Sequence, residues 1–287
     1  MSPADVFGGQ VAVITGAGAG IGEGLARHAA RLGMRVVVAD IDPDAAARVV
    51  AGIADSGGEA TAVIVDVTSY DSVVAMLDAA EAAFGGVDLL VNNAGVHQFG
   101  YLWDLPLEGW DRLQAINVDG VFHGVKAAVP RMAARGGRIW NLSSIGAVTT
   151  IARQGSYLTS KHAVLGLTEA LAVDLAHAGL PITAAVVLPA AVASRIFLDA
   201  EITGEGDVEA ASAAHADMLA LLPTAMDPMD AAAAVFTQAA AGEFYLLPQP
   251  EYVAAVMAER GRQLTERRAP KGRDRTSGGD RAGSAPA

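Results

Sequence analysis

The chain has 287 residues, 52% of them hydrophobic, so it is long enough to bury one large core. Its formal net charge of -12 argues against nucleic acid and anionic membrane surfaces as partners. The absence of cysteine excludes disulfides and thiolate metal ligands, and we expect no metal site. The first nine residues do not resemble a signal peptide, and no apolar run approaches the roughly 20 residues that span a bilayer. We therefore expect a soluble, cytoplasmic protein.

A strand-forming run at 10–15 leads directly into a glycine-rich turn, and a helix-forming segment follows at 23–31. The turn contains Gly16, Gly18, Gly20, Ile21 and Gly22. Glycines let the backbone approach a pyrophosphate, and the N-terminus of the following helix offers unpaired N–H groups. The spacing Thr-Gly-x-x-x-Gly-x-Gly differs from the usual Gly-x-Gly-x-x-Gly. We predict that this turn binds a dinucleotide; the alternative is a tight turn without a ligand.

A second predicted strand at 35–39 ends at Asp40, which lies 18 residues after Gly22. An acid about 20 residues after the glycines binds the adenosine ribose in dinucleotide sites. Its carboxylate accepts hydrogen bonds from the ribose hydroxyls and repels a 2′-phosphate. Ala17 and Ile41 are uncharged, so no base at those two positions compensates. The pattern favours NAD over NADP, unless Asp40 only caps the next helix.

Strand and helix patterns alternate along the rest of the chain. We predict strands at 60–65, 87–91, 137–142, 181–188 and 243–247, and helices at 69–84, 106–135, 155–179, 194–223 (one or two helices) and 230–241. This alternation predicts an α/β fold with a doubly wound parallel sheet of about seven strands and helices on both faces. We expect one domain over residues 1–262, with a substrate-loop region at 194–223, and a disordered tail at 263–287.

Tyr157 and Lys161 stand four residues apart in the predicted helix at 155–179, so they share a face. A free phenol has a pKa of about 10, and a fixed positive charge beside it lowers that value. The pair could therefore act as a general acid and base. The alternative is a surface helix whose tyrosine packs under a lysine stem.

Five motifs occur in order: the glycine turn with Thr15, Asn92-Asn93-Ala94-Gly95, Asn117, Ser144, and Tyr157-x-x-x-Lys161. Together they resemble the short-chain dehydrogenase/reductase family in its short single-domain form, from about Gln10 to Leu247. The resemblance implies a Rossmann-like fold and an NAD-binding enzyme. It also implies that Tyr157 exchanges the substrate proton, Lys161 lowers the Tyr157 pKa and binds the nicotinamide ribose, Ser144 polarises the carbonyl, and Asn117 holds a relay water.

The same resemblance assigns the other cofactor contacts. Asp66 and Val67 would contact the adenine, and Asn93 would contact the adenosine side of the cofactor. Gly95, in the same motif as Asn93, is also a predicted cofactor contact. Val192 would contact the carboxamide. One position departs from the family, because Pro189 is followed by Ala190 where the family usually has glycine. Alanine does not readily adopt a positive φ, so we expect the loop over the nicotinamide to differ in shape.

Substrate contacts should come from the segments after Gly95, between Ser144 and Tyr157, and at 194–223. Candidates are Val96, His97, Phe99, Ile145, Phe197, Leu198 and Met218; of the polar residues, Arg153 and Arg195 could hold a carboxylate. The apolar set suggests a hydrophobic secondary alcohol or ketone of steroid, terpenoid or alicyclic type, unless these side chains only close the core. We expect His97, Ser144, Arg153, Tyr157 and Phe197 to contact it. Alternatives are an idle NAD-binding sensor or scaffold, a reductase of another carbonyl class, and an epimerase or dehydratase.

The helix that carries Tyr157 is apolar around most of its circumference between 163 and 175. Such a helix must be buried on more than one side. One side can pack on the sheet, and the other needs a partner subunit. We therefore expect a homodimer or homotetramer built on a two-fold axis.

Overall fold

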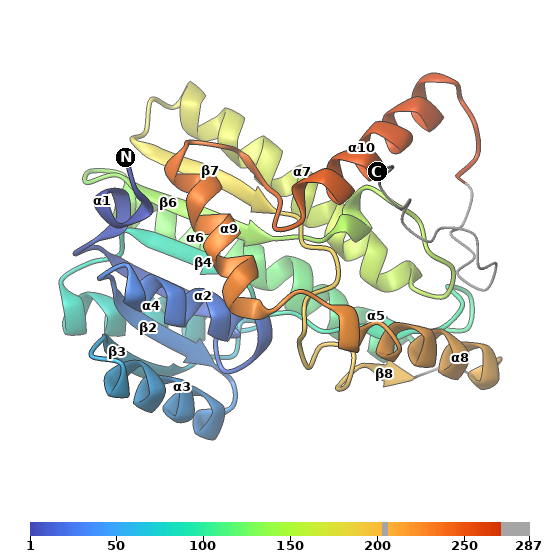
Figure 1. The fold of residues 1–287 in the computed structure, drawn as a ribbon, viewed down its shortest axis with the longest axis horizontal. Helices are drawn as coiled ribbons and strands as arrows, with labels where there is room; N and C mark the ends of the chain where they lie inside the picture. The colour runs from blue at the N-terminus through green and yellow to red at the C-terminus, as the bar shows by residue number, and fades with distance from the viewer. Residues whose placement is uncertain (203–205, 271–287) are drawn as a thin grey trace, which may run out of the picture.

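The computed structural model describes residues 1–202 and 206–270. Within them, seven strands form one parallel sheet in the order β3-β2-β1-β4-β6-β7-β9 (Figure 1). These strands are β1 Val11–Thr15, β2 Arg35–Asp40, β3 Glu59–Ile64, β4 Leu89–Asn92, β6 Gly137–Leu142, β7 Ile182–Val187 and β9 Tyr245–Leu246. The sheet confirms the predicted fold class.

Helices cover both faces of the sheet, and alternate residues of each strand pack against them. On β1, Ala12 and Ile14 belong to one buried layer, whereas Val13 belongs to the other. The first layer contains α1 Pro3–Phe7, α2 Gly20–Arg31, α3 Pro43–Asp55 and α9 Pro228–Ala240. The second contains α4 Tyr70–Phe84, α6 Gly120–Met132 and α7 Gly155–His177. None of the helices in the described ranges is long and apolar enough to cross a membrane.

The strand order reverses between β1 and β4, which lie side by side in the middle of the sheet. Ala12 pairs with Val36 on one side and with Leu89 on the other. From β1 the chain moves outward to β2 and β3, and then returns to β4. A crevice therefore opens at the carboxyl ends of β1 and β4, which is where open parallel sheets bind ligands.

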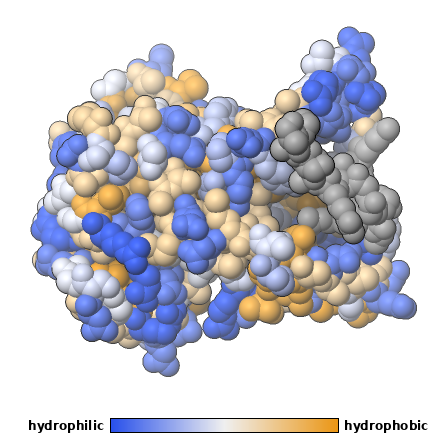
Figure 2. All heavy atoms as spheres, viewed as in Figure 1, coloured by the Kyte–Doolittle hydropathy of each residue, from blue (hydrophilic) through white to orange (hydrophobic). Residues whose placement is uncertain are grey.

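A smaller unit lies beside the sheet and consists of β5 Gln98–Phe99, β8 Glu201–Ile202 and α8 Val208–Leu219. Phe99 packs with Ala211, Ala214 and Met218 in its own small core. Apolar side chains gather at the lower right of Figure 2, where Figure 1 places β8 and α8. We predicted one or two helices over 194–223, and α8 is the α-helix there. The strand β8 was not predicted, and residues 203–205 lie outside the described part.

A last helix, α10 Pro250–Thr265, follows β9 and leads away from the sheet (Figure 1). Val253 and Val256 are its buried side chains. Sequence analysis did not predict this helix, because its few buried positions leave little apolar pattern. It continues to Thr265, three residues into the segment expected to be a disordered tail. Residues 271–287 of that segment lie outside the described residues.

Candidate active site

The glycine-rich turn between β1 and α2 forms one wall of a cavity of about 1290 Å³. Gly16 and Gly20 have φ angles of 62° and 54°, a region that favours glycine. A Cβ atom at Gly22 would lie 2.2 Å from the Gly16 carbonyl oxygen, so no side chain fits there. The helix α2 begins at Gly20 and leaves its first N–H groups without helical partners. The turn therefore fits a bound anion such as a pyrophosphate. The lining of the cavity includes Gly16, Gly18, Gly20, Ile21 and Gly22.

Asp40 ends β2 at the rim of this turn and lines the cavity. Its Oδ2 accepts a hydrogen bond from the Gly18 N–H at 2.7 Å, and its Oδ1 accepts one from the Asp42 N–H at 3.0 Å. The cap of the next helix is Asp42, whose carboxylate accepts from Asp44 and Ala45. Asp40 is therefore not needed as a helix cap, and its carboxylate is fixed beside the glycine turn.

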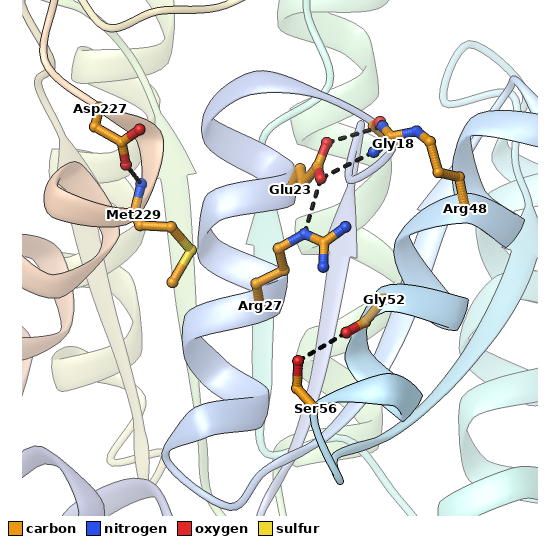
Figure 3. Close-up of polar contacts among 8 residues, drawn as sticks. All are labelled: Gly18, Glu23, Arg27, Arg48, Gly52, Ser56, Asp227 and Met229. Carbon is orange, nitrogen blue, oxygen red and sulfur yellow. Dashed lines mark hydrogen bonds and ion pairs between the residues drawn. The ribbon is translucent and has the colours of Figure 1, made fainter.

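Arg48 is a basic residue at the same rim that sequence analysis missed. Its Nη2 donates to the Gly18 carbonyl at 2.5 Å and pairs with Glu23 at 2.8 Å. Figure 3 shows Glu23 between Arg27 and Arg48, with Arg48 reaching over from α3 to the glycine turn. Burial acts to raise the pKa of Glu23, but its bonds to Arg48 and Arg27 lower it overall. Arg48 reaches the glycine turn from the second turn of α3, so the uncharged residues at 17 and 41 do not exclude a base at this rim.

The ends of β3 and β4 add further residues to the cofactor side. Asn93 directly follows β4, and its side-chain amide donates to the Gly16 carbonyl at 3.0 Å, so it holds the glycine turn in place. Asp66 lies just past β3, where its Oδ1 accepts from the Thr68 N–H at 2.9 Å. The lining on this side includes Asp66, Val67, Asn93 and Gly95, so the cavity brings together all four predicted contacts.

Tyr157, Lys161 and Ser144 meet deeper in the same cavity. Tyr157 and Lys161 lie one turn apart on α7, and both are buried. Ser144 follows β6, and its hydroxyl accepts from the Gly146 N–H at 3.0 Å. The Lys161 ammonium donates to the Leu142 carbonyl at 3.0 Å and lies 5.6 Å from the centre of the Tyr157 ring. The structure thus brings three of the four predicted catalytic residues to one cavity, and the fourth, Asn117, is not among the lining residues.

The protonation of this cluster differs from what we expected. Burial raises the pKa of Tyr157, and a hydrogen bond with Ser144 offsets only part of that rise. Burial also lowers the pKa of Lys161 to about 8. We predicted that Lys161 lowers the pKa of the phenol. The ammonium instead bonds to the Leu142 carbonyl, and removal of the phenol from water is the larger effect.

Asn117 lies in a π-helical turn, Ala115–Asp119, between α5 Leu107–Gln114 and α6. Its Oδ1 accepts from the Val96 N–H at 2.8 Å, and its Nδ2 donates to the Val96 carbonyl and to Ser160 Oγ, each at 3.0 Å. The amide therefore clamps the segment that follows β4. The predicted role in a water relay stays a prediction.

In the loop after β7, the backbone of Ala190 does not adopt the left-handed conformation that a glycine there would allow. Among the described residues other than glycine, Arg153 and Arg267 are the two with positive φ. The Ala190 N–H donates to Gln249 Oε1 at 3.1 Å, and Gln249 Nε2 donates to the Ala191 carbonyl at 3.0 Å. Gln249 is 59 residues away, and no sequence signal pointed to it. Val192 lines the cavity, as does Ser194, which packs against Gly20 and was also missed.

The substrate side brings together most, but not all, of the predicted contacts. His97 and Phe197 line the cavity, and the His97 ring stacks on Tyr157 with 4.1 Å between ring centres. Arg153 is not among the lining residues. Its φ is 65°, and its Nη1 donates to the Ala210 carbonyl at 3.1 Å, so it ties the loop before α7 to α8. Of the apolar candidates, Val96, Ile145, Phe197 and Met218 line the cavity, whereas Phe99 and Leu198 do not.

A doubly wound parallel sheet with a glycine turn at its switch point defines the dinucleotide-binding class of α/β proteins. Comparison with known proteins narrows the class: the family model described as short chain dehydrogenase matches residues 10–202. The chain belongs to the short-chain dehydrogenase family, as the resemblance of its motifs indicated.

Individual curated relatives are 37–38% identical to this chain over about three fifths of its length. The chain is 38% identical over 178 residues to the cyclohexanol dehydrogenase of an Acinetobacter species, covering 61% of this chain and 71% of that one. It is 37% identical over 183 residues to the probable oxidoreductase EphD of Mycobacterium tuberculosis. That match covers 63% of this chain and 31% of EphD, so the chain spans about a third of that relative's length. The crystal structure of a short chain dehydrogenase/reductase from Burkholderia phymatum in complex with NAD has a TM-score of 0.86 at 36% identity, covering 92% of this chain and 97% of that one.

Proposed function

We propose that this chain is an NAD-dependent dehydrogenase that interconverts a hydrophobic secondary alcohol and its ketone. One observation carries the proposal: Ser144, Tyr157 and Lys161 open into the same cavity as the glycine turn. A dinucleotide held by the turn can therefore reach the phenol that handles the substrate proton. An idle NAD-binding sensor would need the turn but not this cluster.

In the oxidation direction, Tyr157 first releases its own proton, and the phenolate then takes the proton of the substrate hydroxyl as the carbonyl forms. Ser144 donates a hydrogen bond to the same oxygen and so stabilises the charge that develops there. Lys161, on the same helix face, keeps a positive charge near the phenol and is placed to hold a ribose hydroxyl. The nicotinamide, when bound, accepts the hydride. The reduction direction uses the same groups in reverse.

NAD is the cofactor that suits the rim of the glycine turn. A fixed carboxylate at Asp40 can accept hydrogen bonds from the ribose hydroxyls, and it would repel a 2′-phosphate. Arg48 is the nearby base that could reverse this preference. Its guanidinium bonds to Glu23 and to the Gly18 carbonyl, so pairing with a phosphate would have to break these contacts. The neighbouring structure from Burkholderia phymatum contains NAD, which supports the same choice.

The substrate we favour is a hydrophobic secondary alcohol of alicyclic, terpenoid or steroid type. Ile145, Phe197 and Met218 give the substrate end an apolar lining. The similar protein from Acinetobacter is a cyclohexanol dehydrogenase, which is in keeping with an alicyclic alcohol.

The test is the appearance of NADH absorbance when the protein is mixed with NAD and a panel of cyclic and terpenoid secondary alcohols. We expect turnover of at least one alicyclic alcohol, and a loss of about 10²- to 10⁴-fold in kcat for Tyr157→Phe. NAD titration of both proteins is the control, since the variant should bind NAD like the parent. Tight NAD binding without turnover of any alcohol would favour the sensor. No binding of NAD or NADP would contradict the proposal altogether.

We also propose that the chain forms a homodimer or homotetramer through α7. Leu175 of this helix is buried in the layer that packs on the sheet, whereas Val173 is 68% exposed. An exposed apolar side on a helix that is also buried on the sheet suits a two-fold contact with a second copy. Light scattering of the purified protein tests this, and a monomer at micromolar concentration would contradict it.

A further inference from the structure

His97 is buried among aromatic side chains at the substrate end of the cavity. Its ring lies between Tyr157 and Phe99, with ring centres 4.1 and 4.3 Å apart and planes tilted by 30° and 32°. The residue is 2% exposed and belongs to the lining of the cavity. An aliphatic or aromatic side chain would fill this position without burying a polar atom, so the imidazole needs a reason to be there.

The contact with Gln154 assigns the proton of the His97 ring to one of its two nitrogens. Nε2 lies 3.3 Å from Gln154 Oε1, and a carboxamide oxygen can only accept, so Nε2 carries the hydrogen. Nδ1 of the neutral ring is then an acceptor. It is buried and makes no hydrogen bond of standard geometry with the residues that the structure describes, although the Gln98 main chain lies near the ring. Burial lowers the pKa of His97 to about 3, so the ring stays neutral at physiological pH.

A buried acceptor without a partner costs free energy, and in a ligand cavity the missing donor can come from the ligand. The imidazole stacks on the Tyr157 ring, so one small molecule could contact both the phenol hydroxyl and the edge of the imidazole. We propose that His97 Nδ1 accepts a hydrogen bond from a second hydroxyl of the substrate, so that the enzyme prefers a diol or a hydroxy ketone over a simple alcohol. This inference rests on the proposed dehydrogenase function.

The test compares cyclohexanol with cis- and trans-cyclohexane-1,2-diol. For each protein we would measure the diol preference, defined as kcat/KM for the better diol divided by kcat/KM for cyclohexanol. We expect a preference of tenfold or more in the parent protein. His97→Phe keeps an aromatic ring but has no acceptor, so the preference should fall by about tenfold to a hundredfold. His97→Asn can place its amide oxygen near the Nδ1 position, and it should keep part of the preference.

A merely structural role of His97 would lower both kcat/KM values together and leave their ratio unchanged, which would overturn the inference. Equal kcat/KM for the diols and cyclohexanol in the parent protein would also overturn it. NAD titration shows whether each variant is folded. If His97→Phe fails that control, His97→Gln decides, because its longer amide reaches toward Gln154 and leaves the Nδ1 position empty. If the parent protein oxidises other alcohols of the panel but neither cyclohexanol nor the diols, this inference fails and the proposed function stands. If it binds NAD and oxidises no alcohol of the panel, the proposed function fails, and this inference fails with it.

Discussion

The two ends of the cavity are built in different ways. At the cofactor end, main-chain groups of the glycine turn and short side chains at strand ends form the wall, as in the bond from Gly18 to Asp40. At the substrate end, the wall consists of side chains from the segments after β4, after β6 and around α8. A site lined by the main chain suits a cofactor that many proteins bind. A site lined by side chains can acquire a different substrate when those side chains are substituted. Substitutions at the two ends should therefore have separate effects on cofactor and substrate.

The largest effect should follow from filling the glycine turn. In Gly22→Ala the new methyl group would lie 2.2 Å from the Gly16 carbonyl oxygen, so the turn must open. We expect the Kd for NAD, measured by fluorescence titration, to rise about a hundredfold. The control is Gly261→Ala on α10, where nothing lies within 4 Å of an added Cβ. That variant should bind NAD normally and gain about 0.5–1 kcal/mol in free energy of unfolding. Normal NAD binding by Gly22→Ala would mean that the turn is not the cofactor site.

The second effect concerns the choice between NAD and NADP. Asp40→Asn removes the charge that should repel a 2′-phosphate and weakens the bonds to the ribose. We expect the ratio of the two Kd values, NADP over NAD, to fall about tenfold to a hundredfold. Asp42→Asn is the matched control, because asparagine caps a helix about as well as aspartate. An equal shift in the two variants would show that the charge near α3 acts at a distance, and not through the ribose.

The third effect should be confined to the substrate end. Phe197 lines the cavity and lies edge-on to His97 with 5.5 Å between ring centres. Phe197→Ala removes apolar contact area, so kcat/KM for a cyclic alcohol should fall about tenfold while the Kd for NAD stays the same. The neighbouring Leu198, which is exposed and does not line this cavity, gives the control variant Leu198→Ala. A change in NAD affinity in Phe197→Ala would show that the two ends are coupled.

The same contrast explains what the sequence could predict. The strand at 137–142 was predicted to its exact bounds, and Asp40 was placed at the end of β2. Both follow from local patterns, because apolar runs and glycine spacings act over a few residues. Once parallel strands alternate with helices, their carboxyl ends must meet at one edge, so the cofactor side could be assembled without a structure.

The substrate end depends on contacts between distant segments, which no local pattern contains. β8 is two residues long and exists because Glu201 and Ile202 pair with Gln98 and Phe99. The bond between Gln249 and the loop after β7 is likewise a long-range contact. Arg153 is a single residue whose contacts the sequence could not predict. Its charge suggested a carboxylate ligand, but its left-handed backbone lies in a loop where the guanidinium reaches the Ala210 carbonyl.

The smallest effect is a pH dependence of stability that the substrate end should impose through His97. Burial, with smaller contributions from the charges of Lys161 and His215, lowers the pKa of this imidazole to about 3. In the unfolded chain a histidine titrates near 6.5. Between these values the unfolded state binds more protons, so the free energy of unfolding falls as the pH drops from 6.5 toward 3. At pH 5.5 the loss should be about 1 kcal/mol relative to pH 7.5.

His97→Phe removes this titration, so its urea unfolding should lose about 1 kcal/mol less than the parent between pH 7.5 and 5.5. His177→Gln, which removes an exposed histidine at the end of α7, is the control and should keep the parent's acid slope. Equal slopes in the parent and His97→Phe would mean that the imidazole titrates as if it were in water. The ring would then be partly charged near pH 6, and Nδ1 could not act as the neutral acceptor on which a diol preference depends.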